Sequence, residues 1–514
     1  MITAVTRTTA TMYLLDTISQ FVELRIFLVS FLVCLCLYEW HNSSPRNIPP
    51  GPWRLPGVGS IPYLIMASYW TGLSFSELHL LLIHLTNSYG KVYSLYIGSK
   101  LLVFLNSYSS IREAFQNKLI SDRPYTDIEE KLGGKGNGIV LSSGSPWIEQ
   151  RRFTLRAFSR FGRRCFEDKI STEASALMRE FSKHGGRAFD PEMHFSKATS
   201  NILCSVVFGK RFDYTDPEFE RLLHINNRQI ELIGPGLVAL YVPLIKYFQG
   251  ALNQELVELA AEQRRKTKKM IAEHKEKFDS NILDCYLDVY RSQIEKSKEN
   301  GTESEVNEDN LISTIRDIFM AGTETSASTL RWLMLYMMEY PQVQSLIHKE
   351  LDAVVGRNRM PRMSDKPKLV YTRATILEVQ RIQSLGPIGF PHMSSQKTFV
   401  GEFEIPAGTI VVPNVWAIDH DPDVWPDPGR FDPNRFISKD GEVFREDEII
   451  PFGIGHRTCV GESLAKIELL LIFSYLLHQF TLKKADEMTK LNFKGIAGAA
   501  YSPQYFEMVA VKRE

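Results

Sequence analysis

Cysteine is scarce in this chain of 514 residues, and the few thiols form no recognisable pattern. A disulfide framework needs a dense, even set of cysteines, and a zinc site usually shows closely paired cysteines or histidines. The sequence therefore suggests neither, and it predicts a reducing compartment on the cytosolic side. Two of the six cysteines fall inside an apolar segment, and the full set lies at positions 34, 36, 165, 204, 285 and 459.

The chain also lacks an excess of charge of either sign, with 60 Lys and Arg against 60 Asp and Glu. A polyanion-binding protein needs a basic surplus, so no nucleic acid partner is expected. Internal repeats at solenoid or propeller periods are absent. After the N-terminal segment, only the polar run 296–310 resembles a linker, and we expect it to be an exposed loop between two helices of one domain.

Strand patterns are few and short, at 91–97, 101–105 and 409–412. Long amphipathic patterns typical of helices fill much of the remainder. The sequence therefore predicts a mainly α fold with a small β region. The principal helices are expected at 166–184, 253–277, 311–339, 341–355 and 460–479.

One long apolar run is present near the N-terminus, from Ile26 to Leu37, and interfacial aromatic residues follow it. The run is shorter than the roughly 20 residues of a membrane span, so we predict a single anchor from Phe21 to Trp40 that includes flanking residues. A cleaved signal peptide is the alternative, but no small-residue cleavage site follows. The expected organisation is an anchor segment at 1–44, a proline-rich hinge at 45–52 and a catalytic domain at 53–514.

The most informative segment frames Cys459 with Phe452, Gly455, Arg457 and Gly461. This frame suits a thiolate bound to haem iron. The glycines let the backbone pass close to a flat macrocycle, the arginine offers hydrogen bonds to a propionate, and the phenylalanine can shield the sulfur. A helix that starts just after Cys459 would favour the thiolate. The alternative is a buried structural cysteine beside a turn.

These residues resemble the haem-binding loop of the cytochrome P-450 superfamily, Phe-x-x-Gly-x-Arg-x-Cys-x-Gly, without departure at any required position. The resemblance implies a single-domain fold around a buried haem b, with the iron held by Cys459. It extends from about the hinge to the end of the chain and is similar to microsomal, family-two-like members.

A second motif, from Ala321 to Ser326, lies midway along the expected helix 311–339. The small pair Ala321 and Gly322 leaves room for a ligand over the iron, and an acid followed by an alcohol can relay protons through water. The alternative is a helical kink in which a threonine hydroxyl bonds back to a carbonyl. The motif resembles the family's oxygen-side motif, which implies that Thr325 is the oxygen-binding alcohol and Glu324 its acidic neighbour.

Glu378 and Arg381 are spaced to pair on one helical face. In the family this pair is completed by an arginine from a later loop, here Arg435, to form a buried charge network that scaffolds the proximal side. Trp147 and Arg151 match the family's Trp-x-x-x-Arg, whose side chains point at the haem propionates; an ordinary surface helix is the alternative.

His392 sits where the family often has a further propionate-binding residue. The expected helix that carries Trp147 and Arg151 also carries Arg152, Arg156 and Arg160 at intervals of four residues. This basic ridge either docks an acidic reductase or is a plain solvated face.

The resemblance implies a monooxygenase that inserts one oxygen atom from O2 into a lipophilic substrate such as a fatty acid, steroid or xenobiotic. The implied partners are an NADPH-cytochrome reductase, with cytochrome b5 as a possible second donor, and membrane lipid, at the endoplasmic reticulum with the catalytic domain in the cytosol. The alternatives are a haem-thiolate peroxide isomerase or dehydratase without reductase, and a non-catalytic membrane haem carrier or sensor.

By family position the substrate lining is expected from 125–140, 226–248, 315–325, 384–391 and 495–502, including the apolar residues Phe319, Leu385, Ile388, Phe390, Ile496 and Ala497.

Overall fold

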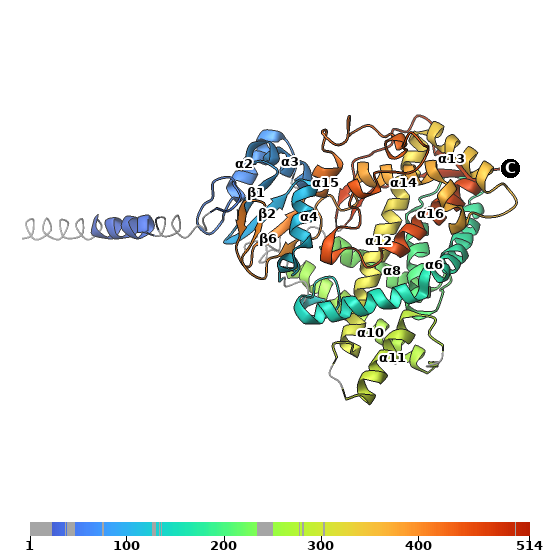
Figure 1. The fold of residues 1–514 in the computed structure, drawn as a ribbon, viewed down its shortest axis with the longest axis horizontal. Helices are drawn as coiled ribbons and strands as arrows, with labels where there is room; N and C mark the ends of the chain where they lie inside the picture. Colours follow the sequence, from blue (N-terminus) through green and yellow to red (C-terminus); the bar gives the residue numbers. More distant parts are fainter. Residues whose placement is uncertain are drawn as a thin grey trace, which may run out of the picture.

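The structure, a computed structural model, describes residues 23–35, 38, 47–74, 77–125, 130–132, 134, 136–233, 250–276, 278–279, 282–301, 304–498 and 500–514. Helices dominate it, and a small sheet lies to one side of the helical body (Figure 1), so the predicted fold class is confirmed. The α-helices are α2 (Ile61–Thr71), α3 (Leu78–Tyr89), α4 (Tyr108–Gln116), α6 (Gly144–Lys183), α7 (Glu192–Phe208), α8 (Pro217–Ile233), α10 (Gly250–Lys275), α11 (Tyr286–Glu299), α12 (Glu308–Glu339), α13 (Pro341–Val354), α14 (Val370–Gln383), α15 (Val415–Asp419) and α16 (Glu462–Gln479).

The largest sheet has four strands in the order β1-β2-β6-β3. β1 and β2 form an antiparallel hairpin whose two-residue turn begins at Gly98 with φ = 60°, a value that glycine adopts without a steric penalty. β6 then pairs parallel to β2, so a segment some 300 residues later in the chain completes the sheet. Two-stranded pairs form from β7 with β10, β4 with β5, and β8 with β9. The strands are β1 (Val92–Ile97), β2 (Lys100–Leu105), β3 (His392–Met393), β4 (Thr398–Val400), β5 (Phe403–Ile405), β6 (Ile410–Pro413), β7 (Phe480–Lys484), β8 (Ile496–Ala497), β9 (Tyr501–Ser502) and β10 (Met508–Lys512).

The strand and helix segments expected from the sequence are all present, with boundaries shifted by a few residues except in α6. That helix runs 40 residues and contains a kink at Gly162, where φ is 66°, so the predicted helix at 166–184 is its second half. The loop expected at 296–310 is shorter than predicted, because α11 continues to Glu299 and α12 already begins at Glu308.

α12 is the central helix of the body and is buried on nearly every side between 310 and 318 and again between 326 and 338. Its N-terminus is capped by Asn307, whose side chain accepts a hydrogen bond from the amide of Asn310. Glu308 and Asp309 in the first turn complement the helix dipole. α7, α10, α14 and α16 pack around α12, which fixes the middle of α12 in the interior of the molecule.

The last residues of the predicted hinge are not a free spacer, because they pack against the sheet. The carbonyl of Pro49 accepts a hydrogen bond from Ser94 Oγ at 2.7 Å, and the carbonyl of Pro50 accepts one from Ser94 N at 2.7 Å. Asn47 bonds through its side chain to the carbonyl of Glu402 at 2.8 Å and through its own carbonyl to Glu404 N at 2.8 Å. Residues 47–50 are therefore tied to β1 and to the β4–β5 hairpin.

Only part of the predicted anchor, Phe21 to Trp40, lies among the described residues. Residues 23–35 are helical, and their apolar side chains are exposed. Within the described part of the chain, no helix combines the length and apolar character that crossing a membrane requires.

Gly51 provides a test of the docked hinge. A Cβ added there would lie 2.0 Å from the carbonyl oxygen of Ser94, so Gly51→Ala must push the chain away from β1. We expect the free energy of unfolding to fall by about 1–3 kcal/mol, as for other overpacked sites, measured by urea denaturation and far-UV circular dichroism. Gly429→Ala is the matched control, because it meets no atom within 4 Å; equal effects of the two variants would contradict the docking.

Candidate functional site

The loop that carries Cys459 is closed by its own backbone. Cys459 N donates to the carbonyl of Phe452 at 2.8 Å, and Thr458 N donates to that of Gly455 at 3.2 Å, across the short 3-10 helix η7 (Gly455–Arg457). Gly461 is the N-cap of α16, so the loop leads directly into that helix. The predicted helix start just after the cysteine is therefore present.

The two glycines serve different purposes. A Cβ on Gly455 would lie 2.0 Å from the carbonyl oxygen of Phe115, and its φ is 79°. Its small size therefore lets the loop pack on the end of α4, a reason that the sequence did not reveal. A Cβ on Gly461 would lie 3.9 Å from the Cys459 sulfur, an ordinary contact beside the thiol.

The Cys459 side chain is accessible to solvent, but protein atoms surround it on most sides. Burial by these surroundings raises the pKa of the thiol above its ordinary value. The amides of Gly461 and Glu462 at the start of α16, together with Arg151, act in the opposite direction and stabilise the thiolate. Since burial prevails, the thiol alone resists ionisation, whereas coordination to iron deprotonates a thiol outright. The helix amides and Arg151 are therefore the features that suit an iron-bound thiolate.

Three arginine side chains meet beside this loop. Arg457 lies 3.6 Å above the ring of Trp147 and donates to the carbonyls of Ser121 at 2.7 Å and Ser142 at 2.6 Å. Arg151 donates to the carbonyl of Thr458 at 2.6 Å. Burial, together with the positive charges of Arg123 and Arg151, lowers the pKa of Arg457 to about 8.

The indole Nε1 of Trp147 is buried without a hydrogen-bond partner among the described residues. A cluster of cations beside an indole N–H without a partner favours the binding of an anionic group. The carboxylates of haem propionates fit this site. The structure therefore brings the predicted residues Trp147, Arg151 and Arg457 together beside Cys459.

Arg123 joins this cluster although the sequence did not single it out. It donates to the carbonyls of Val140 at 3.0 Å and Pro391 at 2.8 Å, and its charge acts on Arg457 and on His392. An arginine followed by proline has no spacing that marks a binding residue, so only the three-dimensional fold reveals it.

His392 lies at the same place and is held in one tautomer. Its Nδ1 donates to the carbonyl of Ile120 at 2.8 Å, and its ring stacks on Phe115 at 3.7 Å. A carbonyl only accepts, so Nδ1 carries the proton. Burial, with help from Arg123, lowers the pKa of His392 well below its ordinary value. A neutral ring leaves Nε2 without a proton, so this histidine would donate to a propionate only in its charged form.

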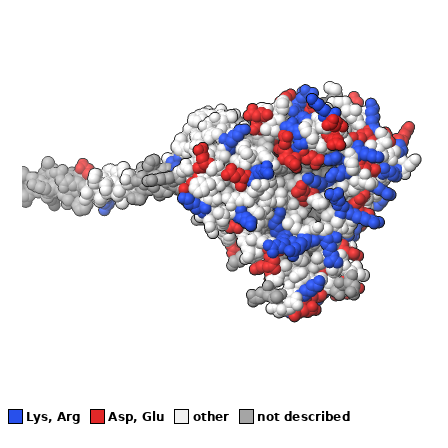
Figure 2. All heavy atoms as spheres, in the orientation of Figure 1, with Lys and Arg blue, Asp and Glu red and all other residues white. Residues whose placement is uncertain are grey.

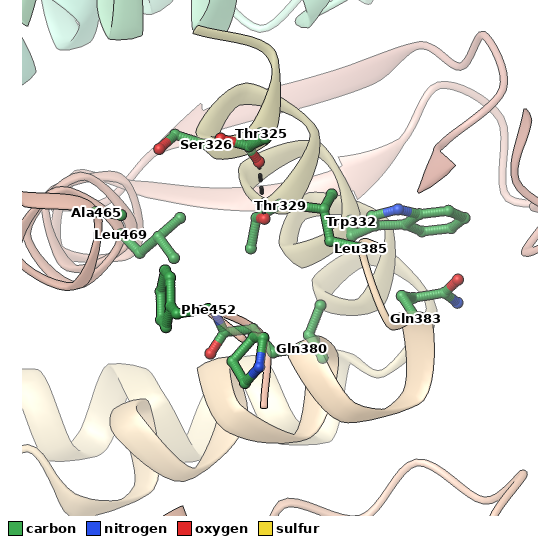
Figure 3. A pocket seen from close by; sticks show the side chains of 12 residues that line it. Thr325, Ser326, Thr329, Trp332, Gln380, Gln383, Leu385, Phe452, Ala465 and Leu469 are labelled. Carbon is green, nitrogen blue, oxygen red and sulfur yellow. Dashed lines mark hydrogen bonds between the residues drawn. The ribbon is translucent and has the colours of Figure 1, made fainter. Parts of the chain in front are cut away.

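A cavity connects the cysteine loop to α12 (Figure 3). Phe452 of the loop and Thr325 of α12 both line it, with residues of α14 and α16 between them. Lys466 lies 5.5 Å from the centre of the Phe452 ring. The two motifs that the sequence singled out thus face one space. Its other lining residues include Ser326, Thr329, Trp332, Leu385, Ala465 and Leu469.

Thr325 shows the back-bonding that a kink would use, since its hydroxyl donates to the carbonyl of Ala321 at 2.5 Å. The carbonyl of Thr325 in turn accepts from Thr329 Oγ1 at 2.9 Å. This contact places the hydroxyl at the cavity and leaves its oxygen able to accept a second hydrogen bond.

Glu324 points to different partners from Thr325. Its Oε1 accepts from Ser328 Oγ at 2.7 Å and from Ser502 Oγ at 3.1 Å, and the two serine hydroxyls lie 2.8 Å apart. Ser502 belongs to β9, so a strand near the C-terminus contributes to the acidic end of the motif. The sequence analysis did not anticipate either serine.

The small pair Ala321 and Gly322 is divided between two faces of α12. Ala321 is exposed, whereas a Cβ on Gly322 would lie 3.0 Å from Leu203 Cδ1 of α7. Gly322 therefore permits close helix packing and does not provide room over the iron. The prediction of a shared role for the pair was wrong for Gly322.

The charge network of α14 is confirmed. Arg381 bonds to both carboxylate oxygens of Glu378, at 2.7 Å and 2.9 Å, and Arg435 lies 3.4 Å from the same carboxylate. Neither side chain of the first pair is exposed. The remaining Arg381 nitrogen donates to the carbonyls of Asp419 and Pro428, so every nitrogen of the buried guanidinium has a hydrogen-bond partner.

Of the expected substrate-lining residues, Leu385 lies at the cavity. Phe319 lies instead at a second cavity between α7, α8, α10 and α12. Phe390 and Ile496 are exposed, and Ile388 packs against the hydrophobic core beside the sheet. Most of 226–248 and residues 126–129 lie outside the described residues.

Comparison with known proteins agrees with this arrangement. The family model described as Cytochrome P450 matches residues 49–506. The chain is 36% identical over 509 residues to "Cytochrome P450 2U1" of Bos taurus, with 95% of this chain and 93% of the relative covered. It is 38% identical to "Cytochrome P450 2U1" of Rattus norvegicus, with 93% of each covered, and 33% identical to "Cytochrome P450 2J5" of Mus musculus, with 95% and 96% covered.

The charge network of Glu378, Arg381 and Arg435 leads to one testable prediction. Glu378→Ala leaves Arg381 buried without its counter-charge, and we expect the free energy of unfolding to fall by about 3–5 kcal/mol, with loss of haem. Urea denaturation and the haem-to-protein ratio measure these effects. The control is Glu180→Ala in the exposed pair with Lys183, where about 0–1 kcal/mol is expected. A Glu378→Ala protein with full haem and unchanged stability would contradict the assignment.

Glu468 of α16 provides a second prediction. It is buried, accepts from Ser326 Oγ at 2.8 Å, and burial raises its pKa from 4.5 to about 8. The folded state therefore keeps a proton that the unfolded chain releases, so stability falls as pH rises from about 4.5 to about 8.

Glu468→Gln keeps the shape and removes the titration. We expect it to be more stable than the parent at pH 8 and to show a flatter pH dependence in thermal unfolding. The exposed substitution Glu487→Gln is the control. If Glu468→Gln followed the parent's pH profile, the carboxyl would not be the group that titrates.

Proposed function

The chain belongs to the cytochrome P450 family and is a haem-thiolate monooxygenase, and we propose that Cys459 is its iron ligand and that it oxidises a lipophilic substrate with electrons from NADPH through a reductase. The main support for this site is that Phe452 of the cysteine loop and Thr325 of α12 line the same cavity. The cationic cluster beside the loop supports it.

On the proximal side, the protein holds the cofactor by charge and by packing. Haem ligated by a thiolate supplies the activation of O2 when it is bound. Arg123, Arg151 and Arg457 would neutralise the propionates, and the negative charge of the propionates would in turn raise the pKa of Arg457. Phe452 covers one side of the sulfur loop, and the Glu378 network fixes α14 beneath it.

On the distal side, Thr325 and Glu324 would supply protons. The Thr325 hydroxyl lies at the cavity and can accept and pass on a proton through water. Glu324 lies one residue earlier and is linked through Ser328 and Ser502. These hydroxyls hold the carboxylate in one orientation, so its second oxygen is available to water on the path to Thr325.

The substrate is proposed to be a fatty acid, a steroid or a foreign lipophilic compound. Leu385, Trp332 and Leu469 give the cavity an apolar wall, which favours apolar ligands. The relatives named above bear the same family-two designation, which supports this range without selecting one member of it.

The proposed location is the endoplasmic reticulum membrane, with an N-terminal anchor from Phe21 to Trp40 and the catalytic domain in the cytosol. The resemblance of the motifs to microsomal members of the family and the exposed apolar helix at 23–35 support it. The reductase is proposed to dock on α6, where Arg152, Arg156 and Arg160 are exposed and basic side chains gather (Figure 2). Cytochrome b5 and membrane lipid are proposed as further partners.

The decisive experiment uses the full-length protein reconstituted with reductase. With carbon monoxide, the reduced parent is expected to show the red-shifted Soret band of thiolate ligation, and Cys459→Ala is expected to lose it. Substrate is found by spin-state shifts across long-chain fatty acids, steroids and foreign aromatic compounds.

Thr325→Ala is expected to keep the spectrum and to lose roughly 100-fold or more of NADPH-driven product formation. Thr325→Ser is the matched control and retains most of it. Turnover of peroxides without reductase would instead identify an isomerase or dehydratase. Haem binding with no turnover in any assay would identify a carrier or sensor.

A further inference from the structure

Three potential metal ligands converge where α10 ends and α11 begins, in the lower part of the molecule in Figure 1. His274 lies in the last turn of α10, Cys285 is the N-cap of α11, and Asp288 lies in its first turn. Cys285 and Asp288 are buried and His274 is nearly so. Their ligand atoms all lie within 4.8 Å of one another. No part of the haem site involves these residues.

Two of the three distances are close to the edges of a tetrahedral zinc site. His274 Nε2 lies 3.4 Å from Cys285 Sγ and 3.1 Å from Asp288 Oδ1. With zinc at about 2.3 Å from sulfur, 2.0 Å from nitrogen and 2.1 Å from oxygen, tetrahedral angles give edges of about 3.5 Å and 3.4 Å. The third edge, between the Cys285 sulfur and the Asp288 carboxylate, lies within 4.8 Å and has to reach about 3.6 Å when the ion binds.

Hydrogen bonds can join the three side chains when no ion is bound. His274 Nε2–H then donates to Asp288 Oδ1, with the weakly accepting sulfur of Cys285 beside it. With the ring proton on Nδ1 and the thiol ionised, the same three atoms present lone pairs to one another, and a cation between them would satisfy all three.

The backbone of α11 already supports both anionic ligands. In the capping box, the Cys285 side chain accepts from the amide of Asp288. Asp288 Oδ2 accepts from Cys285 N at 2.9 Å and from Asp284 N at 3.0 Å, which leaves Oδ1 facing His274. Such outer hydrogen bonds orient ligands and are characteristic of protein metal sites.

We propose that His274, Cys285 and Asp288 bind one Zn²⁺ ion that joins the end of α10 to the start of α11. A thiolate, an imidazole and a carboxylate form a donor set that suits zinc, with water in the fourth position. Binding releases the thiol proton to solvent, and the thiolate and carboxylate then balance the charge of the ion. The site is independent of the proposed monooxygenase function.

The site has a structural consequence for α10. Met270 and Thr267, one and two turns before His274, line the second cavity between α7, α8, α10 and α12. Zinc would hold this end of α10 in place and so stabilise the wall of that cavity. We expect zinc to raise the thermal unfolding temperature of the haem-loaded protein.

The test uses the tag-free, haem-loaded full chain after treatment with a chelator. Equilibrium dialysis against zinc chloride is expected to give one tightly bound zinc per haem, and zinc is expected to protect Cys285 from alkylation, read by mass spectrometry of its peptide. Cys285→Ser keeps a capping hydroxyl but loses the thiolate. Cys285→Ser and His274→Gln should each weaken zinc binding by more than the roughly 10–100-fold that loss of an outer-shell partner causes.

Cys165→Ser is the matched control, because it removes a free thiol on α6 and leaves the cluster intact. It should bind zinc as the parent does. The carbon monoxide spectrum of every variant should be normal, which separates this result from the fate of the haem site. Absence of a tight zinc ion in the parent, or equal binding by all variants, would overturn the proposal.

Discussion

The ion pair between Glu378 and Arg381 is the contact on which the proximal half of the molecule depends. Both side chains have no exposed surface, and every nitrogen of the guanidinium is bonded to a carboxylate or a carbonyl. These acceptors come from α14, from the end of α15 and from the loop at 426–436. A buried pair stabilises only when all its groups are satisfied, so each of these segments is constrained to one position. The cysteine loop follows these segments later in the chain, from Phe452 onward.

Local spacing predicted the parts of the site that lie on single elements. Local spacing cannot indicate, however, which residues distant elements bring to the site. Thr325 and Cys459 were identified by motif, and the structure placed their motifs on one cavity. Arg123 had no such motif, because its role comes from a loop that folds beside Arg457. Gly322 was misread, since the space beside it is filled by Leu203 from α7 and not by a ligand.

The same limit applies to the cysteines. A search for closely paired ligands predicted no zinc site, yet His274 and Cys285 lie 11 residues apart and meet because α10 ends where α11 begins. Their convergence depends on two helices and on a capping box, features that carry no fixed ligand spacing. Conversely, the helix 311–339 was predicted well, because its caps and apolar pattern are local properties of α12.

The docking of residues 47–50 on the sheet has a mechanical consequence. Asn47, Pro49 and Pro50 are bonded to β1 and to the β4–β5 hairpin, so a force applied to the N-terminal segment enters the body through strands at one edge. A slack tether would let the body rotate freely about its point of attachment. A segment fastened at several backbone positions instead fixes the point and the direction at which the chain joins the body.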